Sequence, residues 1–237
     1  MAVFEFPTRV SYDDVDTELK LSLRGVLGLM QEAAIIHSDQ IGYSVNNVSD
    51  THVVWMLVQW RVRITGAAFW NEKVTVRTWP RTMERVTSER DFEIVNADGE
   101  QIAIGESLWT LVGADTGRIT RITKEISDSY ELTDIKVFDS ELGRLEDIPT
   151  TETYKCMVGR RDIDTNHHVN NRVYLDYAFE AIPDFDESRE FREVFIRYRK
   201  QLLLSQPVCC FHGFDNGVHL VNILGNDNEL HATVMLR

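Results

Sequence analysis

The residues best suited to chemistry lie in one short segment, which reads Asp164-Thr165-Asn166-His167-His168-Val169-Asn170-Asn171. In an extended segment, side chains two apart share a face, so Asp164, Asn166 and His168 are expected to point to one side. A histidine can act as donor or general acid–base near neutral pH, and an aspartate can orient it or polarise a water. Backbone N–H groups of the following helix, near Val169 and Asn170, suit an oxyanion on a thioester or ester carbonyl. The alternative interpretation is an N-capping Asn/Asp cluster beside a surface histidine.

The cysteines do not indicate metal or disulfide chemistry. There are three, Cys156, Cys209 and Cys210, with no CxxC pair and no even-numbered disulfide framework. His212 and His219 follow the doublet and are also metal-ligand types. Adjacent thiols on a predicted strand point to opposite faces, so we expect core packing there and no metal site.

The elements around this segment indicate a protein of helices and antiparallel sheets. Apolar residues recur at three- and four-residue steps from Leu19 to Gln40, which predicts a mostly buried helix closed by Gly42. Runs rich in Val, Ile, Trp and Thr predict strands, with a hairpin turn at 97–99. The predicted elements are a strand at 3–12, a helix at 19–40, strands at 52–65, 73–82, 85–97 and 100–115, then a strand at 153–161, a helix at 169–182 and strands at 190–203, 207–214, 217–225 and 229–236.

The second half repeats the order of the first. Laying Asp14–Ala33 over Asp162–Ala181 without a gap gives seven identities in 20 positions, where average residue usage gives about one. We interpret the chain as two copies of one fold. The predicted division is an N-terminal copy at 1–117, a linker at 118–150 and a C-terminal copy at 151–237.

The two copies differ where the candidate chemistry lies. Both keep Asp-x-Asp-Thr just ahead of the helix, a pattern that suits helix capping. Four polar changes separate them: Glu18 to Asn166, Lys20 to His168, Ser22 to Asn170 and Leu23 to Asn171. These amides and the imidazole contribute nothing to packing. We therefore expect a catalytic second copy and a silent first copy.

The pattern resembles that of a known enzyme family. Asp164-x-Asn166-x-His168-Val169-Asn170-Asn171-x-x-Tyr174, inside a two-copy chain, is similar to the acyl-acyl carrier protein thioesterases, which are tandem hotdog folds. The resemblance implies an α+β double hotdog, two tandem copies of a long helix wrapped by an antiparallel sheet. It implies a hydrolase that cleaves medium- to long-chain fatty acyl-acyl carrier protein to free fatty acid and carrier protein, terminating fatty acid synthesis. It implies no cofactor.

The resemblance also implies roles for residues. The catalytic set would be Asp164, Asn166 and His168. The amides that bind substrate would be those of Asn170 and Asn171. The family's Tyr-Arg-x-Glu-Cys segment, with a Glu assigned as base and a Cys once proposed as nucleophile, reads Tyr198-Arg199-Lys200-Gln201-Leu202 here. Gln201 has no titratable carboxylate and Leu202 is no nucleophile. We expect Gln201 to hold a water that Asp164 or His168 polarises, with an acyl-enzyme through Asp164 as the competing route.

The acyl chain needs an apolar slot, which the resemblance places in the first copy. The helix at 19–40 and the strand that begins at His52 are apolar enough, and Trp55 and Met56 are the predicted wall residues. Ordinary core packing is the alternative for each of them. The depth of the slot would set the preferred chain length.

The charge of the chain limits its partners. A net charge of -13 argues against nucleic acid and against stable association with anionic membranes. The basic residues that could dock an acidic carrier protein are local, namely Arg160, Arg161, Arg197, Arg199 and Lys200. The same charges suit coenzyme A phosphates, so an acyl-CoA thioesterase is the second hypothesis and a non-enzymatic acyl-binding protein the third. We expect a cytoplasmic protein, as a monomeric pseudo-dimer or a homodimer.

Overall fold

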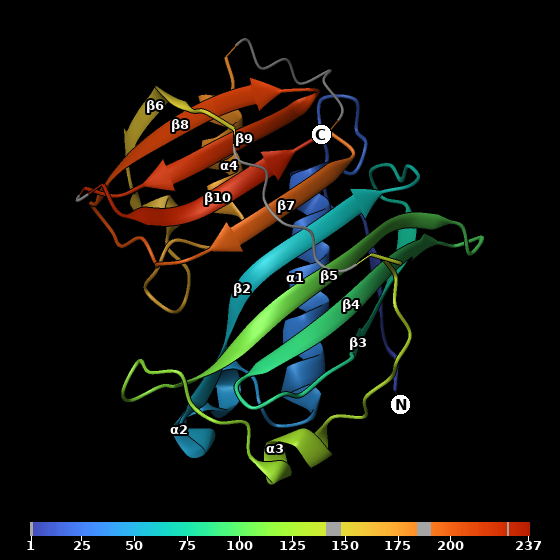
Figure 1. Ribbon diagram of the computed structural model, residues 1–237. Helices are drawn as coiled ribbons and strands as arrows, with labels where there is room; N and C mark the ends of the chain where they lie inside the picture. The colour runs from blue at the N-terminus through green and yellow to red at the C-terminus, as the bar shows by residue number, and fades with distance from the viewer. Residues whose placement is uncertain (1, 141–147, 184–190, 227) are drawn as a thin grey trace. The chain divides into compact units, whose positions relative to one another are not determined.

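A computed structural model describes residues 2–140, 148–183, 191–226 and 228–237 of the chain (Figure 1). The chain divides into two compact units, Met1–Leu142 and Gly143–Arg237. Each unit has one main helix and five antiparallel strands, and the apolar side chains of helix and strands are buried. The predicted fold class, a helix wrapped by an antiparallel sheet in each copy, is confirmed.

The first unit contains strands in the spatial order β1-β3-β4-β5-β2. Its elements are β1 (Phe4–Arg9), the 3-10 turn η1 (Tyr12–Asp14), α1 (Leu23–Gln40), η2 (Val45–Asn47), α2 (Val48–Thr51), β2 (Val53–Ile64), β3 (Lys73–Pro80), β4 (Thr87–Asn96), β5 (Gln101–Gly113) and α3 (Lys124–Ser129). The predicted hairpin joins β4 to β5. Its Gly99 has φ +83°, a left-handed conformation that glycine adopts without steric cost.

Helix α1 packs closely on its sheet because one side of it is apolar. Val26, Met30 and Ala33 are fully buried. Gly105 of β5 lies beneath the helix, where an added Cβ would come within 2.7 Å of the Met30 Sδ. The helix begins at Leu23 rather than at residue 19, because Ser22 is extended and its Oγ accepts the Gly25 N–H at 3.0 Å.

The second unit contains strands in the spatial order β7-β10-β9-β8-β6. Its elements are β6 (Thr151–Met157), η3 (Arg160–Asp162), α4 (Val173–Ala181), β7 (Glu193–Tyr198), β8 (Pro207–Asp215), β9 (Val218–Leu224) and β10 (Leu230–Leu236). Its main helix was predicted from residue 169 but begins at Val173. The segment from Asp164 to Asn171 therefore lies wholly ahead of the helix.

The backbone ahead of the two helices is the same at positions 148 residues apart. Asp16 N–H donates to the Lys20 carbonyl at 2.8 Å, and Asp164 N–H donates to the His168 carbonyl at 2.9 Å. The residue before each acceptor is left-handed, with φ +61° at Leu19 and +63° at His167. A duplication of the fold accounts for this match, including a conformation that non-glycine residues seldom adopt.

Among the described residues, no helix is both long enough and apolar enough to cross a membrane.

Candidate functional site

The segment that carries the predicted catalytic residues is a tight turn, and the expectation of an extended segment was wrong. Asp164 N–H donates to the His168 carbonyl at 2.9 Å, and His167 N–H donates back to the Asp164 carbonyl at 3.1 Å. His167 is left-handed at φ +63°. The alternation that would place three side chains on one face does not apply within such a turn, although the turn still gathers Asp164, Asn166 and His168 within five residues.

The carboxylate of Asp164 helps to build this turn. Its Oδ1 accepts the Asn166 N–H at 2.8 Å. In the first unit, the Oδ1 of Asp16 accepts the Glu18 N–H and the Lys20 N–H, each at 2.9 Å. The first unit has this aspartate–backbone bonding but none of the other candidate catalytic residues. Formation of the turn therefore explains why both copies have an aspartate at this position.

The turn lies beside the loop that carries Gln201. Val169 N–H donates to the Leu202 carbonyl at 2.9 Å, which fixes the chain after His168 against the loop that follows β7. Gln201 precedes Leu202 and is exposed, as is Asn166, while His168 is half-buried. The fold therefore brings Gln201 next to the turn, although more than thirty residues separate them in sequence.

The backbone donors expected for an oxyanion are already in use. Val169 N–H donates to the Leu202 carbonyl, and Asn170 N–H donates to the Asp162 carbonyl at 2.8 Å. The helix also begins at Val173, four residues later than predicted, so neither N–H group belongs to its first turn. Placing the oxyanion at Val169 and Asn170 was wrong, because both donors hold the turn against its neighbours.

Other N–H groups of the turn are candidates for that role. Within the described residues 164–171, the backbone N–H groups of Thr165, His168 and Asn171 have no hydrogen-bond acceptor. The Asn170 side chain is used locally, since its Oδ1 accepts the Arg172 N–H at 3.0 Å. Asn170 occupies the position of the helix cap Ser22 in the first unit, which gives its side chain a structural role.

One buried and one half-buried tyrosine hold the two parts of the site together, and the sequence pattern assigned them no role. The Tyr174 hydroxyl accepts the Leu202 N–H at 3.0 Å, and the Tyr198 hydroxyl donates to the Asn171 carbonyl at 2.9 Å. Their rings meet edge to face at 5.4 Å. Burial raises the pKa of Tyr174 to about 12, so its hydroxyl stays neutral. The place of Tyr174 at the end of the sequence motif was the signal that could have indicated its role.

The predicted docking arginines are at the surface of the second unit. Arg160 and Arg161 lie in η3, just before the turn, and Arg199 follows β7; these three are exposed, whereas Arg197, within β7, is half-buried. Arg161 lies 3.6 Å from Asp162. Sequence proximity to the turn and to Gln201 places these charges next to the candidate catalytic residues.

The predicted slot residues Trp55 and Met56 belong to β2 of the first unit and are half-buried. Trp55 Nε1 donates to the Tyr130 hydroxyl at 3.0 Å, which in turn donates to Ser38 Oγ at 3.1 Å. Trp55 also packs against the apolar cluster around Leu111. These contacts are typical of a packed interior in which the polar atoms of the aromatic side chains are hydrogen-bonded.

A buried arginine lies on the side of this sheet that faces α1. Arg90 NH1 donates to His37 Nδ1 at 3.0 Å and to Thr78 Oγ1 at 3.2 Å. Burial, followed by the nearby Arg90 charge, lowers the pKa of His37 to about 4, so the imidazole is neutral and accepts. His37 is thus a structural histidine whose hydrogen bond is satisfied within the unit.

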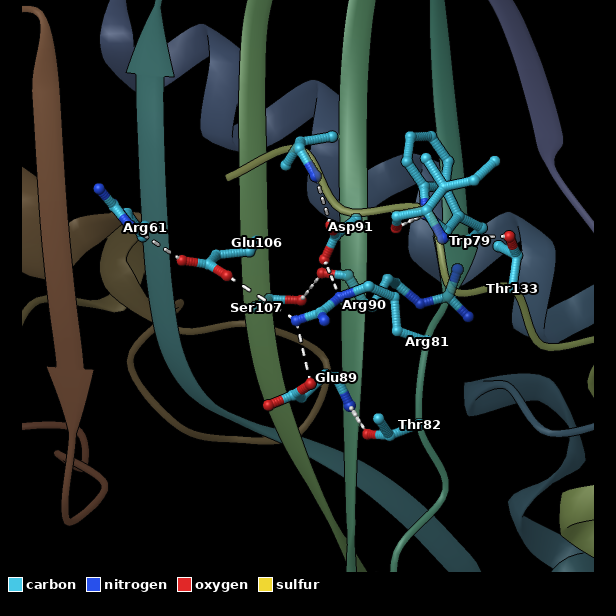
Figure 2. Close-up of polar contacts among 12 residues, drawn as sticks. Arg61, Trp79, Arg81, Thr82, Glu89, Arg90, Asp91, Glu106, Ser107 and Thr133 are labelled. Carbon is cyan, nitrogen blue, oxygen red and sulfur yellow. Dashed lines mark hydrogen bonds and ion pairs between the residues drawn. The ribbon is translucent and has the colours of Figure 1, made fainter. Parts of the chain in front are cut away.

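A second charged cluster lies on the opposite side of the first sheet (Figure 2). Arg81 Nε donates to Asp91 Oδ1 at 2.7 Å, and Glu106 contacts Arg61 at 3.4 Å. The other oxygen of Asp91 accepts the Val137 N–H at 2.9 Å. Burial, then the Asp91 charge, raises the pKa of Glu106 to about 7. The charges pair with one another and with the backbone of a covering segment, so the cluster is accounted for by the structure of the unit.

No group of three or more His, Cys, Asp or Glu side chains among the described residues is arranged to hold a metal. Cys209 is half-buried and Cys210 is buried, and burial raises the pKa of Cys210 to about 12. His212 Nε2 and His219 Nδ1 lie 2.9 Å apart and bond each other. The doublet and these histidines are therefore part of the packing of the second sheet.

Both halves of the chain match models of one protein family. Residues 2–130 match the acyl-ACP thioesterase N-terminal domain, and residues 145–216 match the acyl-ACP thioesterase C-terminal domain. The oleoyl-acyl carrier protein thioesterase 2 of Arabidopsis thaliana is 26% identical over 200 residues, 76% of this chain and 54% of that protein. The palmitoyl-acyl carrier protein thioesterase of Cuphea hookeriana is 24% identical over 79% of this chain and 49% of its own length. The chain thus spans about half the length of these curated relatives.

Solved structures share the whole fold. The 12:0-ACP thioesterase from Umbellularia californica is 19% identical with a TM-score of 0.86, covering 100% of this chain and 97% of that one. An acyl-ACP thioesterase from Bacteroides thetaiotaomicron is 18% identical with a TM-score of 0.85, covering 99% and 97%. At these identities the likeness shows the fold, a helix-and-sheet unit present twice.

Proposed function

We propose that this chain, which belongs to the acyl-ACP thioesterase family and has its double hotdog fold, hydrolyses fatty acyl-acyl carrier protein to free fatty acid and carrier protein. The match of both halves to this family carries the proposal. The second unit supports it further, because its turn has exchanged ordinary surface residues for Asn166 and His168 beside Gln201.

The chemistry we infer is attack of water on the thioester carbonyl. Gln201 orients the water through its amide, since it cannot take the proton. The half-buried His168 accepts that proton and returns one to the departing thiolate. Asp164 keeps the turn in shape through its bond to the Asn166 N–H. The acyl-enzyme route would instead have a carboxylate oxygen of Asp164 attack the carbonyl and expel the thiolate, forming an acyl anhydride that water then hydrolyses.

The tetrahedral intermediate needs hydrogen-bond donors. We assign this role to the N–H groups of His168 and Asn171, which have no acceptor among residues 148–183. Donors with fixed positions stabilise developing charge without reorganisation. The Tyr198 hydroxyl donates to the Asn171 carbonyl and so restrains the backbone at Asn171.

The test is turnover of acyl-carrier protein by the His168→Ala variant. We expect kcat to fall by about 10²–10⁴-fold, which is the usual contribution of a positioned acid–base group. The matched control is His167→Ala, since His167 is exposed and adjacent in the same turn. Undiminished hydrolysis by His168→Ala would overturn the assignment.

We further assign the acyl slot to the first unit and catalysis to the second. A ladder of acyl-carrier proteins from medium to long chains tests both, because slot depth sets the optimum. Shortening Trp55 to Leu should move that optimum, while His168→Ala should lower all chain lengths alike. A shift in optimum caused by His168→Ala would argue against this division.

A coenzyme A thioesterase is the second candidate, because exposed arginines at Arg160, Arg161 and Arg199 also suit nucleotide phosphates. Presenting one acyl group on carrier protein and on coenzyme A separates the two functions. A clear preference for coenzyme A would favour the second. Retention of the acyl thioester with no turnover of either would favour an acyl-binding protein.

A further inference from the structure

The two units present the same surface feature, which we name the turn face. In the first unit it consists of residues 12–22 and 65–72, joined by the Leu21 N–H bond to the Ala68 carbonyl at 2.8 Å. In the second it consists of residues 160–170 and 199–206, joined by the equivalent bond from Val169 to Leu202. Even the left-handed residue near the end of the second segment is repeated, with φ +66° at Asn71 and +64° at Ser205.

Both turn faces expose a pair of large apolar side chains at the same place. Phe69 and Trp70 are 46% and 52% exposed in the first unit, and Leu203 and Leu204 are 44% and 47% exposed in the second. Adjacent exposed apolar side chains can form part of a protein contact surface. Since both copies have the pair, it cannot by itself select one copy over the other.

The charges around the pair are inverted between the copies. The first turn face has five acidic residues and one basic residue, a formal net of -4: Asp13, Asp14, Asp16, Glu18 and Glu72 against Lys20. The second has four basic residues and two acidic ones, a formal net of +2: Arg160, Arg161, Arg199 and Lys200 against Asp162 and Asp164. Two structurally equivalent faces therefore differ by six charges, in a chain whose total is -13.

Part of the basic charge of the second turn face is available to a partner. Lys200 pairs with Glu229, and Arg161 lies near the largely buried Asp162. Arg160 and Arg199 are exposed and have no ion pair among the described residues. Fixed positive charge beside an apolar contact is complementary to an acidic amphipathic surface on another protein.

We propose that this charge inversion selects the docking face, so that the acidic carrier protein binds the second turn face and is repelled by the first. The inference rests on the proposed function, in which the carrier protein delivers the acyl group. Docking there brings the thioester to the copy that contains His168 and Gln201. The equivalent face of the first unit, with no catalytic residues, does not compete for the carrier.

The test is the double variant Arg160→Glu/Arg199→Glu, assayed with one acyl group on carrier protein and on free pantetheine. We expect kcat/KM to fall at least tenfold further for the carrier than for pantetheine, with the gap closing as salt is raised. The control, Lys73→Glu/Arg118→Glu, makes the same charge change at exposed first-unit positions outside the turn face and should leave both substrates unaffected. Equal losses on both substrates, or none, would overturn the proposal.

The reciprocal variant installs second-copy residues on the first turn face, as Asp13→Arg/Glu18→Asn/Glu72→Gln. Titration with carrier protein should then reveal a second binding event, which the wild type lacks. If the variant, like the wild type, binds only one carrier protein, the result would count against the charge mechanism. If the wild type turns over neither substrate but still binds one carrier, the proposed function fails while the docking inference stands.

Discussion

Tyr174→Phe is the sharpest test of how the site is held together. The Tyr174 hydroxyl is the acceptor for the Leu202 N–H at 3.0 Å, and Leu202 is fully buried. Removing the hydroxyl leaves that donor buried with neither a partner nor access to water, which costs about 1–3 kcal/mol. The bond also fixes the residue that follows Gln201, so the loop carrying Gln201 loses one of its anchors to the helix.

Both consequences are measurable. Guanidinium unfolding should show the loss of stability, and turnover of acyl-carrier protein should show kcat reduced roughly ten- to hundredfold, because small displacements of a positioning group are expensive. KM should change by less than about threefold, since the acyl slot and the docking charges are untouched.

Tyr177→Phe is the matched control. Its hydroxyl, on the same helix, donates to Asp162 Oδ2 at 3.1 Å, and that oxygen keeps the Gly159 N–H at 2.7 Å. The variant should lose about 1.5–3 kcal/mol, the value of a hydrogen bond to a charged group, with kcat nearly unchanged. If the two variants lose kcat equally, or if Tyr174→Phe retains full kcat, the proposed anchoring of Gln201 is refuted.

Two further variants test the charged groups. Burial and the Asp91 charge raise the pKa of Glu106 from 4.5 to about 7, so the stability it contributes is full below its unfolded pKa and is lost as pH rises through 7. Between pH 5 and 8, wild type should therefore lose roughly 2–3 kcal/mol more than Glu106→Gln in chemical denaturation; parallel pH profiles would contradict this. Asp164→Asn keeps an Oδ1 acceptor for the turn and should retain activity within about tenfold of wild type, while Asp164→Ala should lose more. Equal inactivity of both would indicate that the carboxylate itself reacts.

The architecture could be predicted from the sequence because its determinants are periodic. Apolar spacing over 19–40 gave the long helix, and alternation with a turn at 97–99 gave the hairpin between β4 and β5. The duplication was detectable because Asp14–Ala33 and Asp162–Ala181 keep the residues that form the same turn and helix. These features depend on patterns many residues long, which chance substitutions do not erase.

The local geometry of the site could not be predicted in the same way. Whether Asp164 to His168 is extended or turned depends on one left-handed residue and one carboxylate–backbone bond. The residue at that position is a leucine in the first copy, which gives no indication of φ near +60°, and a histidine in the second, which favours that conformation only weakly. The misplaced helix start followed from this, and so did the choice of Val169 and Asn170 as oxyanion donors.

The duplication itself supplies the missing information. Asp16 forms the same turn as Asp164 in a unit without the other candidate residues, so the bonds of Asp164 are accounted for by folding. His168 replaces a lysine, and no bond of the shared backbone requires an imidazole at that position. Gln201 lies one residue before Leu202, whose first-copy equivalent is Ala68, so it replaces an alanine. Residues that the fold requires occur in both copies, whereas His168, Gln201 and Asn166 occur only in the second. This difference supports the proposal that His168 and Gln201 carry out catalysis.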